Sequence, residues 1–472
     1  MSFPDSSASD SPVTPSALTP QDDHGVNRGR RRIVLGTPVL AGALAVPAAS
    51  VQAQAGLPER WSAGWGCAPA GPPPSASLLT FTNQTLRLIV RTSLGGKRVR
   101  IRLSNEMGDT DLRIGAARIA ARLGGPDVNA AGNRQLTFGG RTAVTIPAGA
   151  PVLSDPVTLT VAPLTDLSVS LYLPGTARAT TIHNAAYQAS YISTTGDHSA
   201  AAALPVQRAF GSWPFLTEVD VESAAPALVA IGDSVTDGVG STSSANCRWT
   251  DWLARRVQAE LGASRLGIVN RGIAANRLLA DDATALLAGN DVLERFDRDV
   301  LATAGVRSLI ALIGINDIVY SPSTRPIAAE ELIAGYLQLV ARAHLHGITV
   351  VGATLPPFQG FVYYTPEREA VRRPCLRRAL RPVRSARRAD PALPEFRQAR
   401  IGGPLPARGR PVHRQLRHPR DRDRPAQAIE RQPPGERVRL RRLAVDQQVG
   451  AVLPQQEVEQ DLALRRQQRA PY

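Results

Sequence analysis

The strongest constraint on the fold of this chain is a regular alternation of short apolar runs and amphipathic stretches between residues 226 and 360. The run over residues 228–231 is unbroken, as in a strand that is buried on both faces. Three more strand-like runs follow it, over residues 267–270, 308–313 and 348–351. Because strands that alternate with helices form a parallel sheet covered by helices, residues 226–370 are predicted to form an αβα domain.

Three helices are expected around these strands, over residues 248–261, 283–296 and 328–346. In the first and third, apolar residues recur near the spacing of one helix face. These residues are Trp252, Leu253, Val257 and Leu261 in the first helix, and Leu332, Ile333, Tyr336, Leu339 and Val340 in the third.

Residues 57–220 are expected to form an all-β sandwich before the α/β domain. Residues 98–103 alternate strictly, so Val99, Ile101 and Leu103 share one face of a strand. Residues 157–161 and 167–173 alternate in the same way, and turn signals rich in glycine separate the runs. Several short alternating strands with such turns are typical of a sandwich.

The first 55 residues have the pattern of an export signal. Arginines precede an apolar run over residues 33–49, and Ala53-Gln54-Ala55 provides a small-residue cleavage site. Arg31-Arg32 and the apolar residues after it resemble the twin-arginine type of signal. An uncleaved membrane anchor is the alternative, but the run is shorter than the ~20 residues that span a bilayer. We therefore expect an exported protein, periplasmic or secreted, without a stable membrane span.

The net charge of +15 belongs to the C-terminal tail. Residues 372–472 hold 25 Arg and 10 Asp plus Glu, a balance of +15, so 30 basic and 30 acidic residues remain and cancel elsewhere. Residues 371–472 are rich in Arg, Pro and Gln without apolar periodicity, which predicts a disordered tail. No nucleic-acid partner is expected for the neutral, foldable part. A tail that binds polyanions is the alternative.

Cysteine usage and motif content argue against a disulfide scaffold and against a cofactor. Cys67, Cys247 and Cys375 leave open either one disulfide or three free thiols. No P-loop or dinucleotide fingerprint follows the first predicted strand, and no His, Cys and Asp group has metal-ligand spacing. We expect no cofactor and no metal.

Polar motifs follow three of the predicted strands. The first is Gly232-Asp233-Ser234-Val235-Thr236-Asp237-Gly238, and the others span residues 270–276 and 314–317. The carboxyl ends of parallel strands form the ligand-binding edge of an open α/β sheet, so Ser234 is placed there as a nucleophile. The Ser234 N–H, the Gly272 N–H and the Asn316 side chain would be donors for an ester oxyanion. Taken singly, Gly272 also fits a turn and Asn316 a helix cap.

In this order and spacing, Gly-Asp-Ser, the isolated glycine and Gly-x-Asn-Asp resemble the first three motif blocks of the SGNH (GDSL) hydrolases. The resemblance implies a flavodoxin-like αβα sandwich and hydrolysis of carboxylic esters. It implies that Ser234 is the nucleophile and that Gly272 and Asn316 complete the oxyanion hole. Residues 83–87 and 102–105 also resemble the β-rich domain that precedes some SGNH domains, so the resemblance covers about residues 57–370.

The family's last block, Asp-x-x-His, has no counterpart in this chain. Its His is the general base for the serine, and its Asp orients that His. The downstream residues His413 and His418 lack an Asp three positions before them. A serine without its general base is a poor nucleophile, so one interpretation of the missing block is that the protein is inactive. His183 and His198 of the β-rich region are the alternative bases.

The sequence therefore predicts an exported SGNH-type esterase that forms an acyl-enzyme on Ser234. Its expected substrates are small esters, such as acetylated sugars or short-chain acyl esters. The alternative function is a non-catalytic carbohydrate-binding or cell-surface protein, in which the β-rich domain carries the activity.

We hypothesise that the chain leaves its ancestral reading frame shortly after Ala370, where α/β patterning gives way abruptly to the Arg- and Pro-rich string. Translation of the other two frames of the resequenced gene is expected to show an Asp-x-x-His block. Its absence from both frames would contradict the hypothesis.

Overall fold

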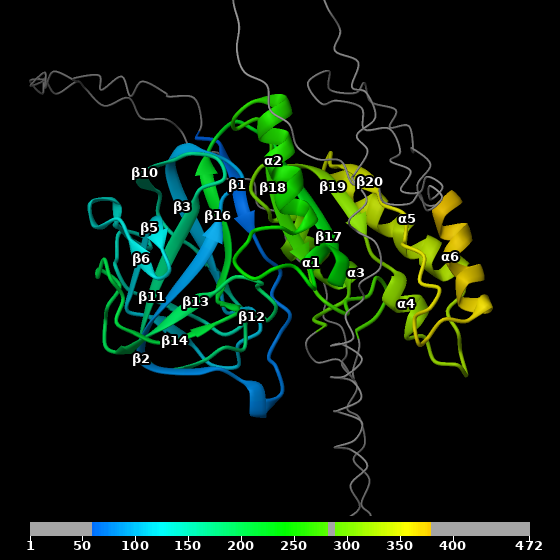
Figure 1. Cartoon of the computed structure of the whole chain (residues 1–472), viewed down its shortest axis with the longest axis horizontal. Helices are drawn as coiled ribbons and strands as arrows, with labels where there is room; N and C mark the ends of the chain where they lie inside the picture. Colours follow the sequence, from blue (N-terminus) through cyan, green and yellow to red (C-terminus); the bar gives the residue numbers. More distant parts are fainter. Residues whose placement is uncertain (1–58, 282–287, 379–472) are drawn as a thin grey trace, which may run out of the picture. The chain divides into compact units, whose positions relative to one another are not determined.

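The computed structural model describes residues 59–281 and 288–378, and these ranges form two layered domains (Figure 1). The predicted export signal lies outside the described residues, as does the predicted tail from residue 379 onward. No helix among the described residues is both long and apolar enough to cross a membrane.

The first domain is a β-sandwich, as predicted. One sheet has the order β1 (Trp61–Gly66), β16 (Leu216–Glu222), β3 (Gly96–Ser104) and β10 (Val157–Val161), with β9 (Pro151–Leu153) beside β3. The other has the order β14 (Val206–Phe210), β13 (Ser190–Thr195), β2 (Thr80–Arg91), β11 (Asp166–Arg178), β5 (Ala116–Gly124) and β6 (Asp127–Val128), with β7 (Arg134–Leu136) beside β5. Two short pairs join β12 (Ile182–His183) to β15 (Trp213–Pro214), and β4 (Leu112–Ile114) to β8 (Val144–Ile146). Short 3₁₀ turns cover Ser75–Ser77 and Ala130–Gly132.

The sandwich core follows from the alternation in the sequence. Val99, Ile101 and Leu103 of β3 are fully buried, and every second residue of β11 from Leu167 to Leu173 packs in the same core cluster. Side chains alternate between the two faces of a strand, so one alternating run places one apolar face in the core.

The second domain contains the predicted parallel sheet, with the order β18 (Gly267–Gly272), β17 (Ala227–Gly232), β19 (Val306–Leu312) and β20 (Thr349–Gly352). This is the start of the flavodoxin-like order 2-1-3-4. The helices are α1 (Ser234–Asp237), α2 (Trp249–Leu261), α3 (Val292–Phe296), the π-helical turn η3 (Asp297–Leu301), α4 (Ile315–Val319), α5 (Ala329–Leu345) and α6 (Pro366–Arg378). Within the described residues this sheet has no fifth strand.

Three details of the second domain differ from the sequence prediction. Of the helix expected over residues 283–296, residues 283–287 lie outside the described residues and residues 288–291 are not helical. Helix α3 begins at Val292, where Asp291 caps it by accepting a hydrogen bond from the Glu294 N–H at 3.0 Å. Trp252 of α2 is 56% exposed instead of facing the sheet, and Arg255 stacks over its ring. Helix α6 continues to Arg378, beyond the boundary predicted at residue 370, and its Cys375 packs in the domain core.

The two domains are joined by a buried charge pair. Arg271 of β18 and Glu218 of β16 are both buried, and they form an ion pair. Arg271 also donates to the Thr217 carbonyl at 2.9 Å, and Glu218 accepts from the Ala304 N–H at 3.2 Å. Strand β1 adds a backbone hydrogen bond from Ala63 N to Ala304 O at 2.9 Å. The sandwich is therefore an integral part of the packing around β18.

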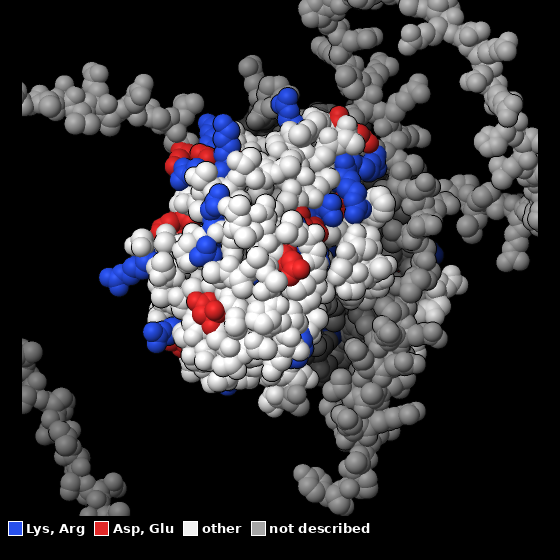
Figure 2. All heavy atoms as spheres, turned by 60° about the vertical axis from the view of Figure 1, so that its left-hand side comes forward, with Lys and Arg blue, Asp and Glu red and all other residues white. Residues whose placement is uncertain are grey.

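On the face shown in Figure 2, the described residues form neither a predominantly positive nor a predominantly negative surface. Basic and acidic side chains are interspersed there among wide uncharged areas. This pattern agrees with the balance of charges expected outside the tail. All three cysteines are free thiols, and Cys67 and Cys375 are buried.

Replacing Glu218 with Gln leaves the buried Arg271 guanidinium without its counter-charge. We expect a loss of ~3–5 kcal/mol in the free energy of unfolding, measured by urea denaturation, because removal of one partner strands the other charge in the interior. The control is Glu331→Gln, which breaks the exposed pair with Arg325 and should change stability by less than ~1 kcal/mol. Equal losses in the two variants would contradict the assigned role of the buried pair.

Candidate active site

Ser234 lies at the carboxyl end of β17, at the start of the single-turn helix α1. Asp233 caps this turn, since its Oδ1 accepts a hydrogen bond from the Val235 N–H at 3.0 Å. Gly238 closes it with φ 99° and donates its N–H to the Ser234 carbonyl at 2.9 Å. Ser234 is 6% exposed, and its hydroxyl makes no hydrogen bond to any described residue. The turn is thus fixed, and its serine hydroxyl has no competing hydrogen-bond partner among the described residues.

Direct contacts bring the three predicted loops together at this edge. Gly232 pairs with Gly272 on one side and with Leu312 on the other, so the loops leave neighbouring strands at the same level. The Ala274 N–H donates to Asp237 Oδ2 at 2.9 Å, which ties the second loop to α1. Asn316 Nδ2 donates to the Asn276 carbonyl at 3.0 Å, which ties the third loop to the second.

Gly272 is required by close packing and not by a turn. A Cβ atom at this position would lie 2.1 Å from the Asp237 backbone nitrogen, so α1 packs directly on the glycine. Its N–H, predicted to be an oxyanion donor, donates instead to Asn270 Oδ1 at 2.8 Å. The catalytic role of Gly272 stays a prediction, and it requires that this hydrogen bond be exchanged for one to the substrate.

Within the same loop, the Ala275 N–H is the backbone donor that remains. The other N–H groups of the loop have acceptors. Gly272 donates to Asn270 Oδ1, Ile273 to the Gly232 carbonyl, Ala274 to Asp237 Oδ2 and Asn276 to the Ile273 carbonyl. The Ala275 N–H has no acceptor among the described residues, and Ala275 has φ 61°. A left-handed conformation is strained for a residue with a Cβ atom. No sequence signal pointed to this amide, because alanine carries no sign of such a conformation.

The third loop presents Asn316 from the first turn of α4. Gly314 makes the sharp turn after β19 with φ 113°, so the helix cap is Gly314 and not the Asn-Asp pair. A side-chain amide has two N–H donors, and the contact with Asn276 uses one of them. The neighbouring Asp317 accepts hydrogen bonds from the Leu278 and Leu279 N–H groups at 2.8 and 3.0 Å. Burial raises the pKa of Asp317 to about 6.

Arg295 supports the carboxyl edge of the parallel sheet through its hydrogen bonds, and the sequence analysis did not identify it. It is buried and donates to the Gly232 carbonyl at 3.2 Å, to the Arg271 carbonyl at 2.8 Å and to Asn276 Oδ1 at 3.0 Å. Its counter-ion is Asp299 at 2.8 Å. Burial alone would raise the pKa of Asp299, but the guanidinium groups of Arg298 and Arg295 beside it hold that pKa at about 2. The sequence shows only an Arg and an Asp four residues apart, a common pattern on an exposed helix.

None of the described histidines is placed as a base for Ser234. His183 is buried, and both of its ring nitrogens are engaged, with the Ala68 carbonyl at 2.8 Å and with Asp237 Oδ1 at 3.1 Å. His198 contacts the Thr195 carbonyl at 3.1 Å within the sandwich. His344 and His346 end α5 just before β20 begins, so they lie at the opposite edge of the parallel sheet. His413 and His418 lie outside the described residues.

Among the described residues, one cluster of three carboxylates has the spacing of a metal site, and it is formed by Asp281, Asp291 and Glu294. These side chains are exposed or half-exposed, and exposed acidic groups commonly lie together without a metal ion. They give no ground for assigning a cofactor.

Comparison with known proteins gives one family match, over residues 230–413, to the GDSL-like lipase/acylhydrolase family. Solved structures with similarity include a putative lipolytic protein of the G-D-S-L family from Desulfitobacterium hafniense, with 24% identity over 31% of this chain and 67% of that chain and a TM-score of 0.23. An acetyl xylan esterase from Geobacillus stearothermophilus shows 22% identity over 33% and 70%, with a TM-score of 0.24. An aryl esterase from M. smegmatis shows 19% identity over 33% and 78%, with a TM-score of 0.27. No curated protein matches the chain.

Replacing Gly272 with Ala places a Cβ atom against the backbone of α1. We expect a loss of ~1–3 kcal/mol in the free energy of unfolding, because overpacking forces the backbone to shift. The matched control is Gly175→Ala, where an added Cβ meets nothing within 4 Å. Chemical denaturation of both variants checks the prediction, and a Gly272→Ala protein as stable as the control would show it to be wrong.

Proposed function

Because residues 230–413 of this chain match the model of the GDSL-like lipase/acylhydrolase family, a family of carboxylic ester hydrolases, we propose that the protein cleaves esters of small acyl groups through an acyl-enzyme on Ser234. The observation that carries this proposal is the edge of the sheet where Ser234, the 272–276 loop and Asn316 are tied together by hydrogen bonds. Acetylated sugars and short-chain acyl esters are the proposed substrates.

The chemistry follows from the groups at that edge. The Ser234 hydroxyl attacks the ester carbonyl, the bond to the alcohol breaks, the proton lost by Ser234 ends on the departing alcohol oxygen, and the acyl group is left on Ser234 Oγ. The oxyanion formed on attack is stabilised by N–H donors, here the Ser234 and Ala275 amides and the second N–H of Asn316. The Gly272 amide joins them once it is released from Asn270.

We propose that turnover is slow. The general base must remove the proton from Ser234 and later activate the water that releases the acyl group. No described histidine takes this position, and the Asp-x-x-His block is missing from the sequence. Acylation and deacylation both lack this base, but the good leaving group of an activated ester favours acylation alone. Such an ester should therefore acylate Ser234 faster than water hydrolyses the acyl-enzyme.

We also propose that the protein is exported, from the arginines, apolar run and small-residue cleavage site within residues 1–55. N-terminal sequencing of the mature protein after expression should place its first residue directly after Ala55. An intact N-terminus in the cell interior would contradict export.

The proposed function predicts that p-nitrophenyl acetate leaves one acetyl group on Ser234. We expect a burst of about one p-nitrophenol per protein molecule followed by slow turnover, because the p-nitrophenolate leaving group favours acylation while deacylation lacks its base. Mass spectrometry of peptides locates the acetyl group, and Ser234→Ala should abolish both the burst and the label. The matched control is Ser243→Ala, an exposed serine of the next loop. A burst that survives in Ser234→Ala would remove Ser234 as the nucleophile.

A further inference from the structure

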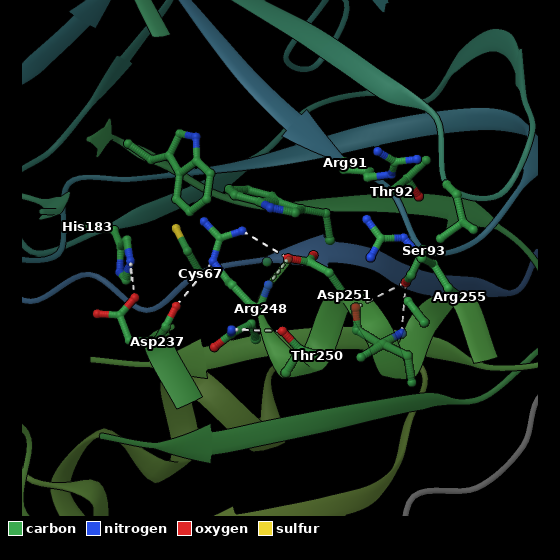
Figure 3. Close-up of a pocket in the computed structure, with 17 residues that line it drawn as sticks. Cys67, Arg91, Thr92, Ser93, His183, Asp237, Arg248, Thr250, Asp251 and Arg255 are labelled. Atoms are coloured by element: carbon green, nitrogen blue, oxygen red, sulfur yellow. Dashed lines mark hydrogen bonds and ion pairs between the residues drawn. The ribbon is translucent and has the colours of Figure 1, made fainter. Parts of the chain in front are cut away.

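The carboxylate of Asp237 connects three segments that are far apart in the sequence. Asp237 ends the turn that begins at Ser234. Its Oδ1 contacts His183 Nε2 of the sandwich strand β12 at 3.1 Å, and its Oδ2 accepts the Ala274 N–H at 2.9 Å. Arg248, at the start of α2, donates its Nε–H to the Asp237 carbonyl at 3.2 Å (Figure 3). The Asp237 side chain therefore links the turn that carries Ser234 to the second loop and to the sandwich.

His183 is held in a single orientation by its surroundings. It is 4% exposed, its ring stacks on Trp213 with centroids 5.5 Å apart, and its Nδ1 lies 2.8 Å from the Ala68 carbonyl. The Trp213 indole is itself anchored by a hydrogen bond to the Ile89 carbonyl at 2.9 Å. A ring fixed in this way can transmit the position of the sandwich to Asp237.

Both ring nitrogens of His183 face acceptors, a carbonyl oxygen and a carboxylate oxygen. A neutral imidazole has one N–H, whereas an imidazolium has two, so only the charged form satisfies both contacts. Burial lowers the pKa of His183, but the facing Asp237 carboxylate and the hydrogen bonds outweigh that effect, and the pKa is raised.

Two further groups face this imidazole. The Arg248 guanidinium opposes its charge. Cys67 lines a pocket together with His183, Asp237 and Arg248 (Figure 3), and it stays a neutral thiol because burial raises its pKa well above the usual range.

We infer that the sandwich domain completes the catalytic edge, with His183 as a positioning residue that acts through Asp237 to hold the Ser234 turn against the 272–276 loop. This inference rests on the proposed function for its effect on catalysis, but the contact itself does not. It gives the first domain a role in the reaction that requires no ligand of its own.

The inference predicts how the contact between His183 and Asp237 changes with pH. The contact is complete while His183 is charged, and one of its two hydrogen bonds is lost as the pH rises through the raised pKa. Stability and positioning from this contact are therefore present below an ordinary His pKa of about 6.5 and decline above the raised value. A general base acts with the opposite sign, because protonation at low pH removes its activity.

The first test measures hydrogen exchange of the Ala274 amide in the full chain, beside an NMR titration of the His183 ring. In the unmodified protein, protection of Ala274 should fall as His183 loses its proton, beyond the ordinary tenfold increase in exchange per pH unit. In His183→Gln, which keeps an N–H donor but does not titrate, that extra loss should disappear. The matched control is His198→Gln, which removes the other sandwich histidine and should leave the pH dependence unchanged. Protection that ignores the titration of His183 in the unmodified protein would overturn the inference.

The second test follows the acylation of Ser234 by p-nitrophenyl acetate. His183→Ala should lower the acylation rate constant ~10–100-fold while the half-saturating ester concentration stays within ~twofold, because a misplaced nucleophile reacts slowly without binding less. His183→Gln should restore the rate below the pKa of His183. A rate unchanged in His183→Ala would overturn the positioning role. If exchange at Ala274 follows His183 but no ester acylates Ser234 in any variant, the proposed function fails and the structural coupling stands.

Discussion

The candidate active site depends on one buried cation, Arg295, and on the carboxylate that balances it. This guanidinium donates to the carbonyl of Gly232, which ends β17, to the carbonyl of Arg271 in β18 and to the Asn276 side chain, and Asp299 neutralises it. The Gly232 carbonyl already accepts the Ile273 N–H at 3.1 Å, and because a carbonyl oxygen has two lone pairs, Arg295 adds a second donor there. Arg295 satisfies these groups at the point where the nucleophile loop and the second loop leave the sheet. One buried charge therefore contacts both strands and the second loop at this edge.

Strand β18 shows how the same few residues serve both domains. Successive side chains of a strand point to opposite faces, so Asn270 and Arg271 diverge. Asn270 contacts the Thr236 carbonyl near the nucleophile turn and the Gly272 amide, while Arg271 is buried against Glu218 of the sandwich. Together with the contact between His183 and Asp237, this gives the first domain two charged connections to the catalytic edge. Both lie within a few residues of the groups that would carry the reaction.

The sequence predicted the architecture well, because period-two and period-3.6 patterns report directly which faces are buried. The strands from β17 to β20, the sandwich and the helix α5 follow from such patterns. Of the helix predicted over residues 283–296, the described residues 288–291 are not helical, because Asp291 caps a helix that begins at Val292. Trp252 was assigned to an apolar helix face by its spacing, yet it is exposed and Arg255 stacks over its ring. Of the site, Ser234 and the three loops could be found from motifs that follow strands. Arg295, Ala275 and the state of the Gly272 amide could not, because each depends on contacts between segments distant in the chain.

What the sequence determined alone is the order of strands and helices, the position of Ser234 after a buried strand, and the absence of an Asp-x-x-His block, since all three are local patterns of residue type. What the tertiary structure decided is which donors of the edge are free, which charge supports them, and that the sandwich reaches Asp237 through His183. A hydrogen bond is a property of two groups at a set distance and angle, and folding alone brings together groups separated by tens of residues.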